Sequence, residues 1–179
     1  MISDAWWERN RTWATFLLIA LMIGLFFTGR FAATGYVEMF RLVSDGAPTV
    51  MAIAGWLLYI APFGLLWAVV VMAERASAKT PATLCLALLL LLAPIDLSLF
   101  PGGVNSWLGE TVSGPGGGAF VTGMRNGCLA GVVASVTIPF VLFNETLRNH
   151  FGGRTLAYML IAPIGTFVAA TLVAAITLA

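Results

Sequence analysis

Two ionisable side chains, Asp96 and Arg125, fall inside otherwise apolar stretches of the chain. A lone charge in a membrane is costly, so such residues pair with one another or face a polar cavity. By the helical rise, Asp96 lies about 7 Å from the loop that joins the two stretches, and Arg125 lies about 9 Å from it. The similar depth predicts a mutual ion pair, with Asn126 or Glu110 as further polar partners.

This intramembrane polar pair has two interpretations that the sequence leaves open. It could pin two helices together, with the alternative that Arg125 extends its side chain to the lipid headgroups. It could also serve as a gate for a proton, an ion or a substrate.

Enzyme chemistry finds little support in the remaining residues. The single histidine, His150, falls in a polar turn, so neither two haem ligands nor a histidine cluster for zinc is available. The serines of the apolar stretches have no histidine or lysine in the same region to act as a base. Cys85 and Cys128 lie in apolar segments, where small buried hydrophobes are expected. We therefore expect a non-catalytic protein with no cofactor and no metal site.

Small residues recur every four positions in two apolar segments, and such positions share one face of a helix. A small face lets two membrane helices approach until their backbones nearly touch. Because a short turn joins the two segments, we predict that their small faces pack against each other, although either could face another subunit. These helix-packing residues are Gly123, Gly127, Gly131 and Ser135 in the first segment and Ala162, Thr166, Ala170 and Ala174 in the second.

The composition sets the class of protein that holds these residues. Sixty per cent of the residues are hydrophobic and 9% are charged, with a mean hydropathy of +0.96. Soluble domains carry about 25% charged residues. The chain is predicted to be an all-α integral membrane protein whose residues 1–179 form a single transmembrane domain in contact with lipid. The net charge of +1 gives no reason to expect a nucleic-acid partner.

The apolar stretches predict a bundle of five transmembrane helices, an additional interfacial helix and one long loop. The transmembrane segments are approximately 12–30, 48–73, 81–100, 119–145 and 155–178. The interfacial helix is expected at approximately 35–44, and an outer Gly-rich loop, flexible in its second half, at 101–118.

Aromatic residues mark the expected membrane interface around the first segment. Trp6, Trp7 and Trp13 stand beside its start, where tryptophan is enriched. Tyr36 and Phe40 fall on the apolar face of the expected interfacial helix, which would act as a docking element or as a plain connector.

The basic residues predict the orientation. With five crossings and a cytoplasmic N-terminus, six of the nine lysines and arginines lie inside and three lie outside. The C-terminus then lies outside, and we expect a bacterial-type inner (plasma) membrane. If the third segment were only re-entrant, the split would fall to five against four.

Two functions follow from these expectations. The first is a non-catalytic integral membrane subunit or scaffold of a larger inner-membrane assembly, such as a secretion, transport or electron-transfer complex. It would pack against other integral membrane subunits or form a homo-oligomer, using its small-residue faces. The alternative is a small oligomeric ion or solute transporter or channel gated by the Asp96–Arg125 pair.

Overall fold

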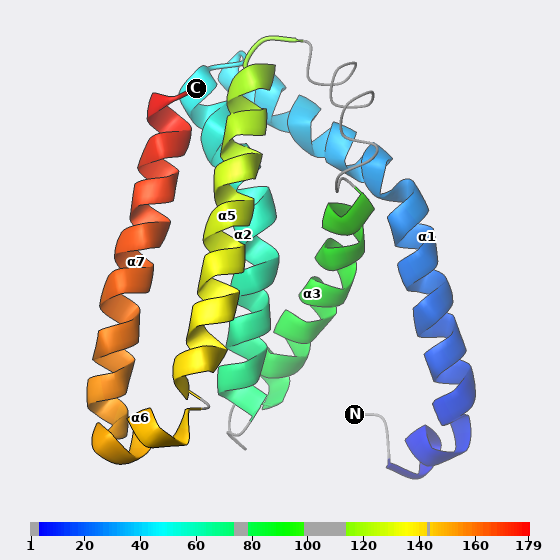
Figure 1. Ribbon diagram of the computed structural model, residues 1–179. Helices are drawn as coiled ribbons and strands as arrows, with labels where there is room; N and C mark the ends of the chain where they lie inside the picture. The colour runs from blue at the N-terminus through cyan, green and yellow to red at the C-terminus, as the bar shows by residue number, and fades with distance from the viewer. Residues whose placement is uncertain (1–3, 74–78, 99–113, 143) are drawn as a thin grey trace.

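The protein is a bundle of helices in a computed structural model that describes residues 4–73, 79–98, 114–142 and 144–179 (Figure 1). No strand occurs in these four ranges. The helices are α1 (Asp4–Ser44), α2 (Pro48–Ala73), α3 (Lys79–Ser98), α5 (Gly117–Leu142), α6 (Glu145–His150) and α7 (Gly153–Thr177).

Four of the described helices are long and apolar enough to cross a membrane, so the chain is a multi-pass membrane protein. The crossing segments are Thr12–Gly29, Pro48–Met72, Gly117–Val141 and Gly153–Thr177. The apolar part of α3 is shorter and covers Thr80–Asp96. In Figure 1 the long helices and α3 alternate in direction along the chain, so that α2 and α5 run parallel.

The expected separate helix at 35–44 is wrong, because these residues are the last part of α1. No proline interrupts the chain after the first apolar segment, so the helix continues to Ser44. In Figure 1 the upper part of α1 leans over the start of α2. The Thr28 hydroxyl donates to the carbonyl oxygen of Gly24 at 2.8 Å, a type of contact that often bends helices.

The glycines of α5 lie against the backbone of α2. A Cβ atom built on Gly123 would collide with the carbonyl oxygen of Ala52, and one on Gly127 would collide with that of Trp56. In return, a Cβ on Gly55 of α2 would collide with the carbonyl oxygen of Phe120. The two backbones therefore touch over more than one helical turn, which only glycine permits.

The prediction that this glycine face packs against the small face of α7 is wrong. Gly131 continues the contact with α2, since its missing side chain makes room for the ring of Phe63. In α7, Ala162, Thr166 and Ala170 are exposed and Ala174 is half-buried. The Thr166 hydroxyl donates to the carbonyl oxygen of Ala162 at 2.8 Å, within its own helix.

Helix α7 still contacts α5 and α2, but through a different face. The buried residues of α7 are Leu156, Leu160, Thr171 and Ala175. The indole Nε1 of Trp56 donates to the Thr171 hydroxyl at 3.4 Å and joins α2 to α7. A short connection therefore makes α5 and α7 neighbours, but it does not decide which faces meet.

At the upper end of the bundle, the turn after α1 packs against the residues that precede α5. A Cβ atom on Gly46, which has a φ of +70°, would lie 2.5 Å from the Cβ of Pro115. The Nε atom of Arg41 donates to the carbonyl oxygen of Pro115 at 3.3 Å, and its guanidinium also pairs with Glu38. The prediction of a flexible loop at 101–118 is therefore wrong for its last residues. Residues 114–116 pack tightly, and 117–118 belong to α5. Residues 101–113 lie outside the described residues.

A matched pair of glycine substitutions tests the contact between α2 and α5. We expect Gly123→Ala to lower the free energy of unfolding by about 1–3 kcal/mol, because a methyl group must separate two touching backbones. Gly118→Ala in the same helix meets nothing within 4 Å and should be neutral or stabilising by up to about 1 kcal/mol. Thermal unfolding in detergent measures both, and equal midpoints would contradict the contact.

Candidate functional site

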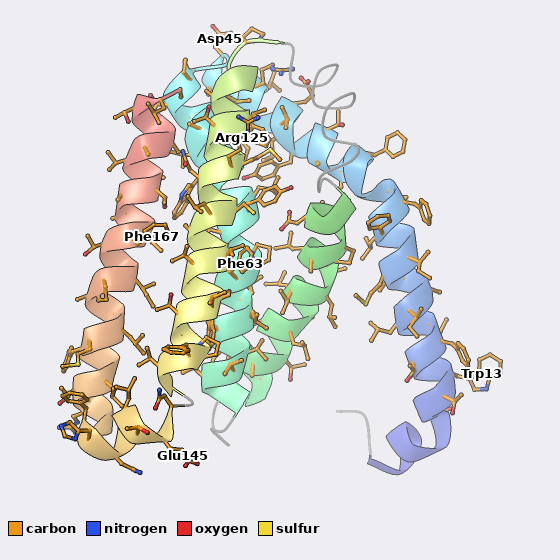
Figure 2. All side chains as sticks on the ribbon, viewed as in Figure 1. Trp13, Asp45, Phe63, Arg125, Glu145 and Phe167 are labelled. Carbon is orange, nitrogen blue, oxygen red and sulfur yellow. The ribbon has the colours of Figure 1, made fainter. Side chains whose placement is uncertain are left out.

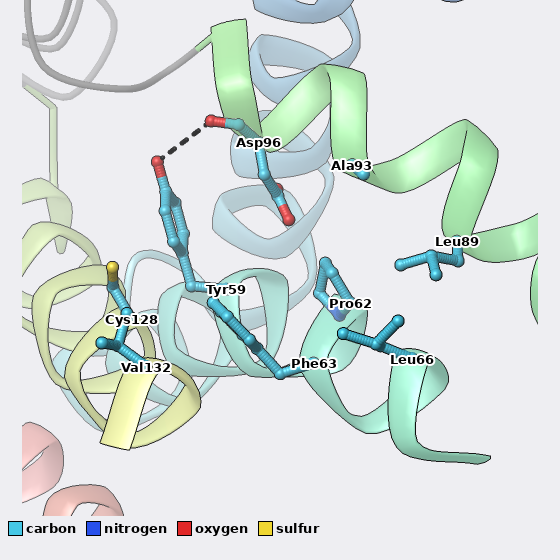
Figure 3. Close-up of a pocket in the computed structure, with 9 residues that line it drawn as sticks. All are labelled: Tyr59, Pro62, Phe63, Leu66, Leu89, Ala93, Asp96, Cys128 and Val132. Atoms are coloured by element: carbon cyan, nitrogen blue, oxygen red, sulfur yellow. Dashed lines mark hydrogen bonds between the residues drawn. The ribbon is translucent and has the colours of Figure 1, made fainter. Parts of the chain in front are cut away.

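Asp96 lies close to the end of α3, on the side of that helix that faces α2 and α5. Its carboxylate oxygen Oδ1 is buried and has no hydrogen-bond partner within the described part of the chain. In Figure 3 the carboxylate points downward, past Tyr59 and toward Pro62. A buried polar atom without a partner costs free energy, and Asp96 is the ionisable residue among those with such an atom in the described bundle.

Tyr59 forms a hydrogen bond with the backbone near the end of α3 but not with the Asp96 carboxylate. Its hydroxyl donates to the backbone carbonyl oxygen of Asp96 at 3.4 Å, and this is the bond drawn in Figure 3. Tyr59 is buried on α2, nearly one turn after Trp56. The tyrosine therefore fixes the backbone from which the carboxylate projects and leaves Oδ1 free.

A pocket of about 330 Å³ lies between α2, α3 and α5, next to the Asp96 carboxylate. Apart from Asp96, its lining is almost entirely hydrocarbon, aromatic ring and one thiol. The lining residues are Tyr59, Pro62, Phe63, Leu66, Leu89, Ala93, Asp96, Cys128 and Val132 (Figure 3). The surface that the pocket exposes is entirely apolar, so its shape and chemistry suit an apolar body.

The predicted ion pair between Asp96 and Arg125 is wrong. Arg125 is exposed, and the ion pair found in the described residues joins Arg41 to Glu38 instead. Gly123 and Gly127 each lie two positions from Arg125, so Arg125 lies about 200° away from the glycine contact with α2. Equal depth did not bring the charges together, because depth leaves the rotation of each helix undetermined.

Asn126 and Glu110 were the further polar residues expected near this pair, and Ser135 was expected on the glycine face of α5. Asn126 is half-buried on α5. Ser135 is also half-buried, and its hydroxyl has no hydrogen-bond partner among the described residues. Glu110 lies outside the described residues. The charged groups inside the described spans therefore occupy two places. Asp96 lies beside the pocket (Figure 3), and Arg125 lies on the exposed surface of α5 (Figure 2).

The aromatic residues predicted at the membrane interface divide into two groups. Trp13 is 72% exposed, as an interfacial ring would be, whereas the side chains of Trp6 and Trp7 lie outside the description. Tyr36 and Phe40 pack toward the bundle, with ring centroids 4.8 Å apart.

The Tyr36 hydroxyl links α1 to α2 by donating to the carbonyl oxygen of Ala54 at 2.9 Å. Burial, together with the charge of Asp96, raises the pKa of Tyr36 to about 12. The hydroxyl therefore remains a donor even at alkaline pH, where an exposed tyrosine would begin to ionise.

The described residues contain no group of three His, Cys, Asp or Glu side chains that could hold a metal ion. Comparison of the chain with protein-family models, with curated proteins and with solved structures gives no match.

Sequence reasoning found Asp96 and missed the side chains that surround it. Cys128 was expected only as a small buried hydrophobe, and no role was predicted for Tyr59, Phe63 or Val132. The available signal was Tyr59, since a buried tyrosine hydroxyl in an apolar helix needs an acceptor on a neighbouring element.

A double-mutant cycle distinguishes paired from separate charges. We expect the effects of Asp96→Ala and Arg125→Ala on the free energy of unfolding to add within about 0.5 kcal/mol, because the two side chains do not touch. Trp56→Phe and Thr171→Val serve as the positive control, with a coupling of about 0.5–1 kcal/mol from their hydrogen bond. A larger coupling energy for the charged pair than for the control would contradict this expectation and indicate that Asp96 and Arg125 form an ion pair.

Proposed function

We propose that the chain is a non-catalytic integral membrane subunit that docks a partner transmembrane helix on the outer face of α5. The single observation that carries this proposal is Arg125, an exposed guanidinium in a membrane-crossing segment with no partner among the described residues. A charge in that position is costly in lipid and calls for a counter-charge.

Arg125 stands at one end of an exposed apolar stripe on α5. The stripe residues recur at intervals of three and four, so they share one face of the helix. They are Arg125, Leu129, Val132, Val136 and Phe140, and the last is 70% exposed. This docking stripe lies on the side of α5 opposite the glycine contact. It presents four apolar side chains to a partner helix, with the Arg125 guanidinium at one end.

Charge complementarity defines the partner as a membrane helix with an Asp or Glu at the depth of Arg125. A second copy of this chain fits less well, because Asp96 is the single acidic residue inside its apolar segments and its carboxylate oxygen Oδ1 is buried within the bundle. We therefore favour a different integral membrane protein, within a larger inner-membrane assembly. The alternative function, a transporter gated by an Asp96–Arg125 pair, is less favoured because the two side chains do not pair.

The proposed topology has five crossings, with the N-terminus in the cytoplasm and the C-terminus outside a bacterial-type inner membrane. It counts α3 as a crossing, and its 20 residues extend about 30 Å, the thickness of a bilayer core. The alternating helix directions in Figure 1 support it. So does the excess of basic residues on the inner side, six against three.

Capture from native membranes tests the docking stripe. A tagged chain purified in mild detergent should retain stoichiometric partners, and Arg125→Ala should reduce the retained amount about tenfold or more, because the partner carboxylate loses its counter-charge. Arg154→Ala removes an exposed arginine at the start of α7 and should leave the partners bound. An unchanged set of partners for Arg125→Ala would contradict the proposal.

Reporter fusions test the topology. Alkaline phosphatase fused after Ala179 should be active and green fluorescent protein there should be dark, because the C-terminus is predicted outside. Fusions after Gly152, between α6 and α7, should give the reverse result. If α3 were re-entrant and the N-terminus cytoplasmic, both fusion sites would exchange sides and the two results would invert.

A further inference from the structure

We infer that the pocket between α2, α3 and α5 receives one large apolar side chain of the partner helix that docks on α5. The inference rests on the proposed function, because it describes how that same partner is held. It defines the partner more closely, as a membrane helix with an Asp or Glu opposite Arg125 and a large apolar residue, such as phenylalanine, two helical turns away. The partner is then recognised by the spacing of two side chains as well as by its charge.

The pocket is open because two of the helices that line it do not pack together. Helices α3 and α5 each pack against α2, and they form no substantial contact with each other in the described residues. The lining includes Phe63 and Leu66 from α2, Ala93 from α3 and Val132 from α5 (Figure 3). Leu66 and Val132 remain 40% and 45% exposed, so the pocket opens to the surroundings of the bundle beside them.

The surface inside the pocket selects an apolar occupant. The pocket exposes no polar atom, and Oδ1 of Asp96 is buried beside it. A polar group placed there would lose its hydrogen bonds without replacement. An apolar side chain instead gains van der Waals contacts, which are a main source of affinity between helices in lipid.

The volume of the pocket limits the occupant to part of a helix. About 330 Å³ is at the lower end of the range for small-molecule sites. A whole helix, about 10 Å across with its side chains, does not fit. A single large side chain fits and displaces the void, whereas alanine would leave the pocket empty. Aromatic or aliphatic anchors that fill pockets carry much of the binding free energy at interfaces.

Val132 connects the pocket to the docking stripe, because it belongs to both. It follows Arg125 by seven residues, which is two turns or about 10 Å along the same side of α5. A helix that places a carboxylate at Arg125 and follows the stripe therefore crosses the mouth of the pocket. The partner side chain seven positions from that carboxylate lies at the level of Val132.

Synthetic membrane-spanning peptides test this spacing with the purified full chain in a neutral detergent. The host peptide is a leucine helix with alanine along one face, and that face carries one Glu with either Phe or Ala seven positions away. A partner can run parallel or antiparallel to α5, so Phe follows the Glu in one peptide and precedes it in another. We expect one Phe peptide to bind about fivefold or more tightly than the Ala peptide. Equal affinity of all three peptides overturns the inference.

Ala93→Phe fills the pocket from α3 without changing the docking stripe. This variant should bind the Phe and Ala peptides alike, because its own ring takes the place of the partner ring. Ala87→Phe makes the same change at an exposed position of α3 outside the pocket lining and should keep the preference for Phe. A preference for Phe that survives Ala93→Phe shows that the ring binds elsewhere and overturns the inference.

A peptide with Gln in place of Glu separates this inference from the proposed function. Equal binding of the Glu and Gln peptides to the wild type overturns the proposed function, and this inference with it. A preference for Glu that is lost in Arg125→Ala, without any gain from Phe, supports the docking stripe and overturns the inference about the pocket. A lipid acyl chain held in the pocket gives this second result, because it leaves no room for the ring.

Discussion

The structure depends on the direct contact between the backbones of α2 and α5. In lipid no hydrophobic effect drives helices together, so van der Waals contact over a closely fitted surface must hold them. Gly55 on α2 and Gly123 and Gly127 on α5 allow that contact, because each would collide with the opposite backbone if it carried a Cβ atom. Glycine here serves close approach, since all three positions have ordinary helical backbone angles.

This contact fixes the positions of the charged residues. With the glycine face of α5 against α2, the residues two positions away must point outward, and Arg125 is one of them. Cys128, next to Gly127, and Val132, which also belongs to the docking stripe, form one wall of the pocket. Asp96 on α3 completes that pocket from the opposite side. The rotational setting of α5 therefore places Arg125 on the surface, whereas Asp96 is buried by the position of α3.

Hydropathy was sufficient to predict an all-helical membrane protein, because apolar segments of this length have few other stable forms. The small-residue spacing also identified Gly123 and Gly127 as residues without room for a side chain. It could not identify their partner, since any helix with a small face would fit. Connection length favoured α7, whereas the parallel helix α2 carries Gly55 at the matching position. The extension of α1 to Ser44 was missed because hydropathy marks the membrane boundary and not the end of a helix.

The predicted ion pair failed for a reason that bears on function. Pairing would have compensated both Asp96 and Arg125 within one chain, and helix depth allowed it. The fold instead separates them, so neither charge contributes a stabilising contact to the described bundle. Polar groups that break the local rules of stability without compensation are expected where a protein binds something else. One charge is buried on α3 and the other lies on the exposed face of α5, so no single counterpart can reach both.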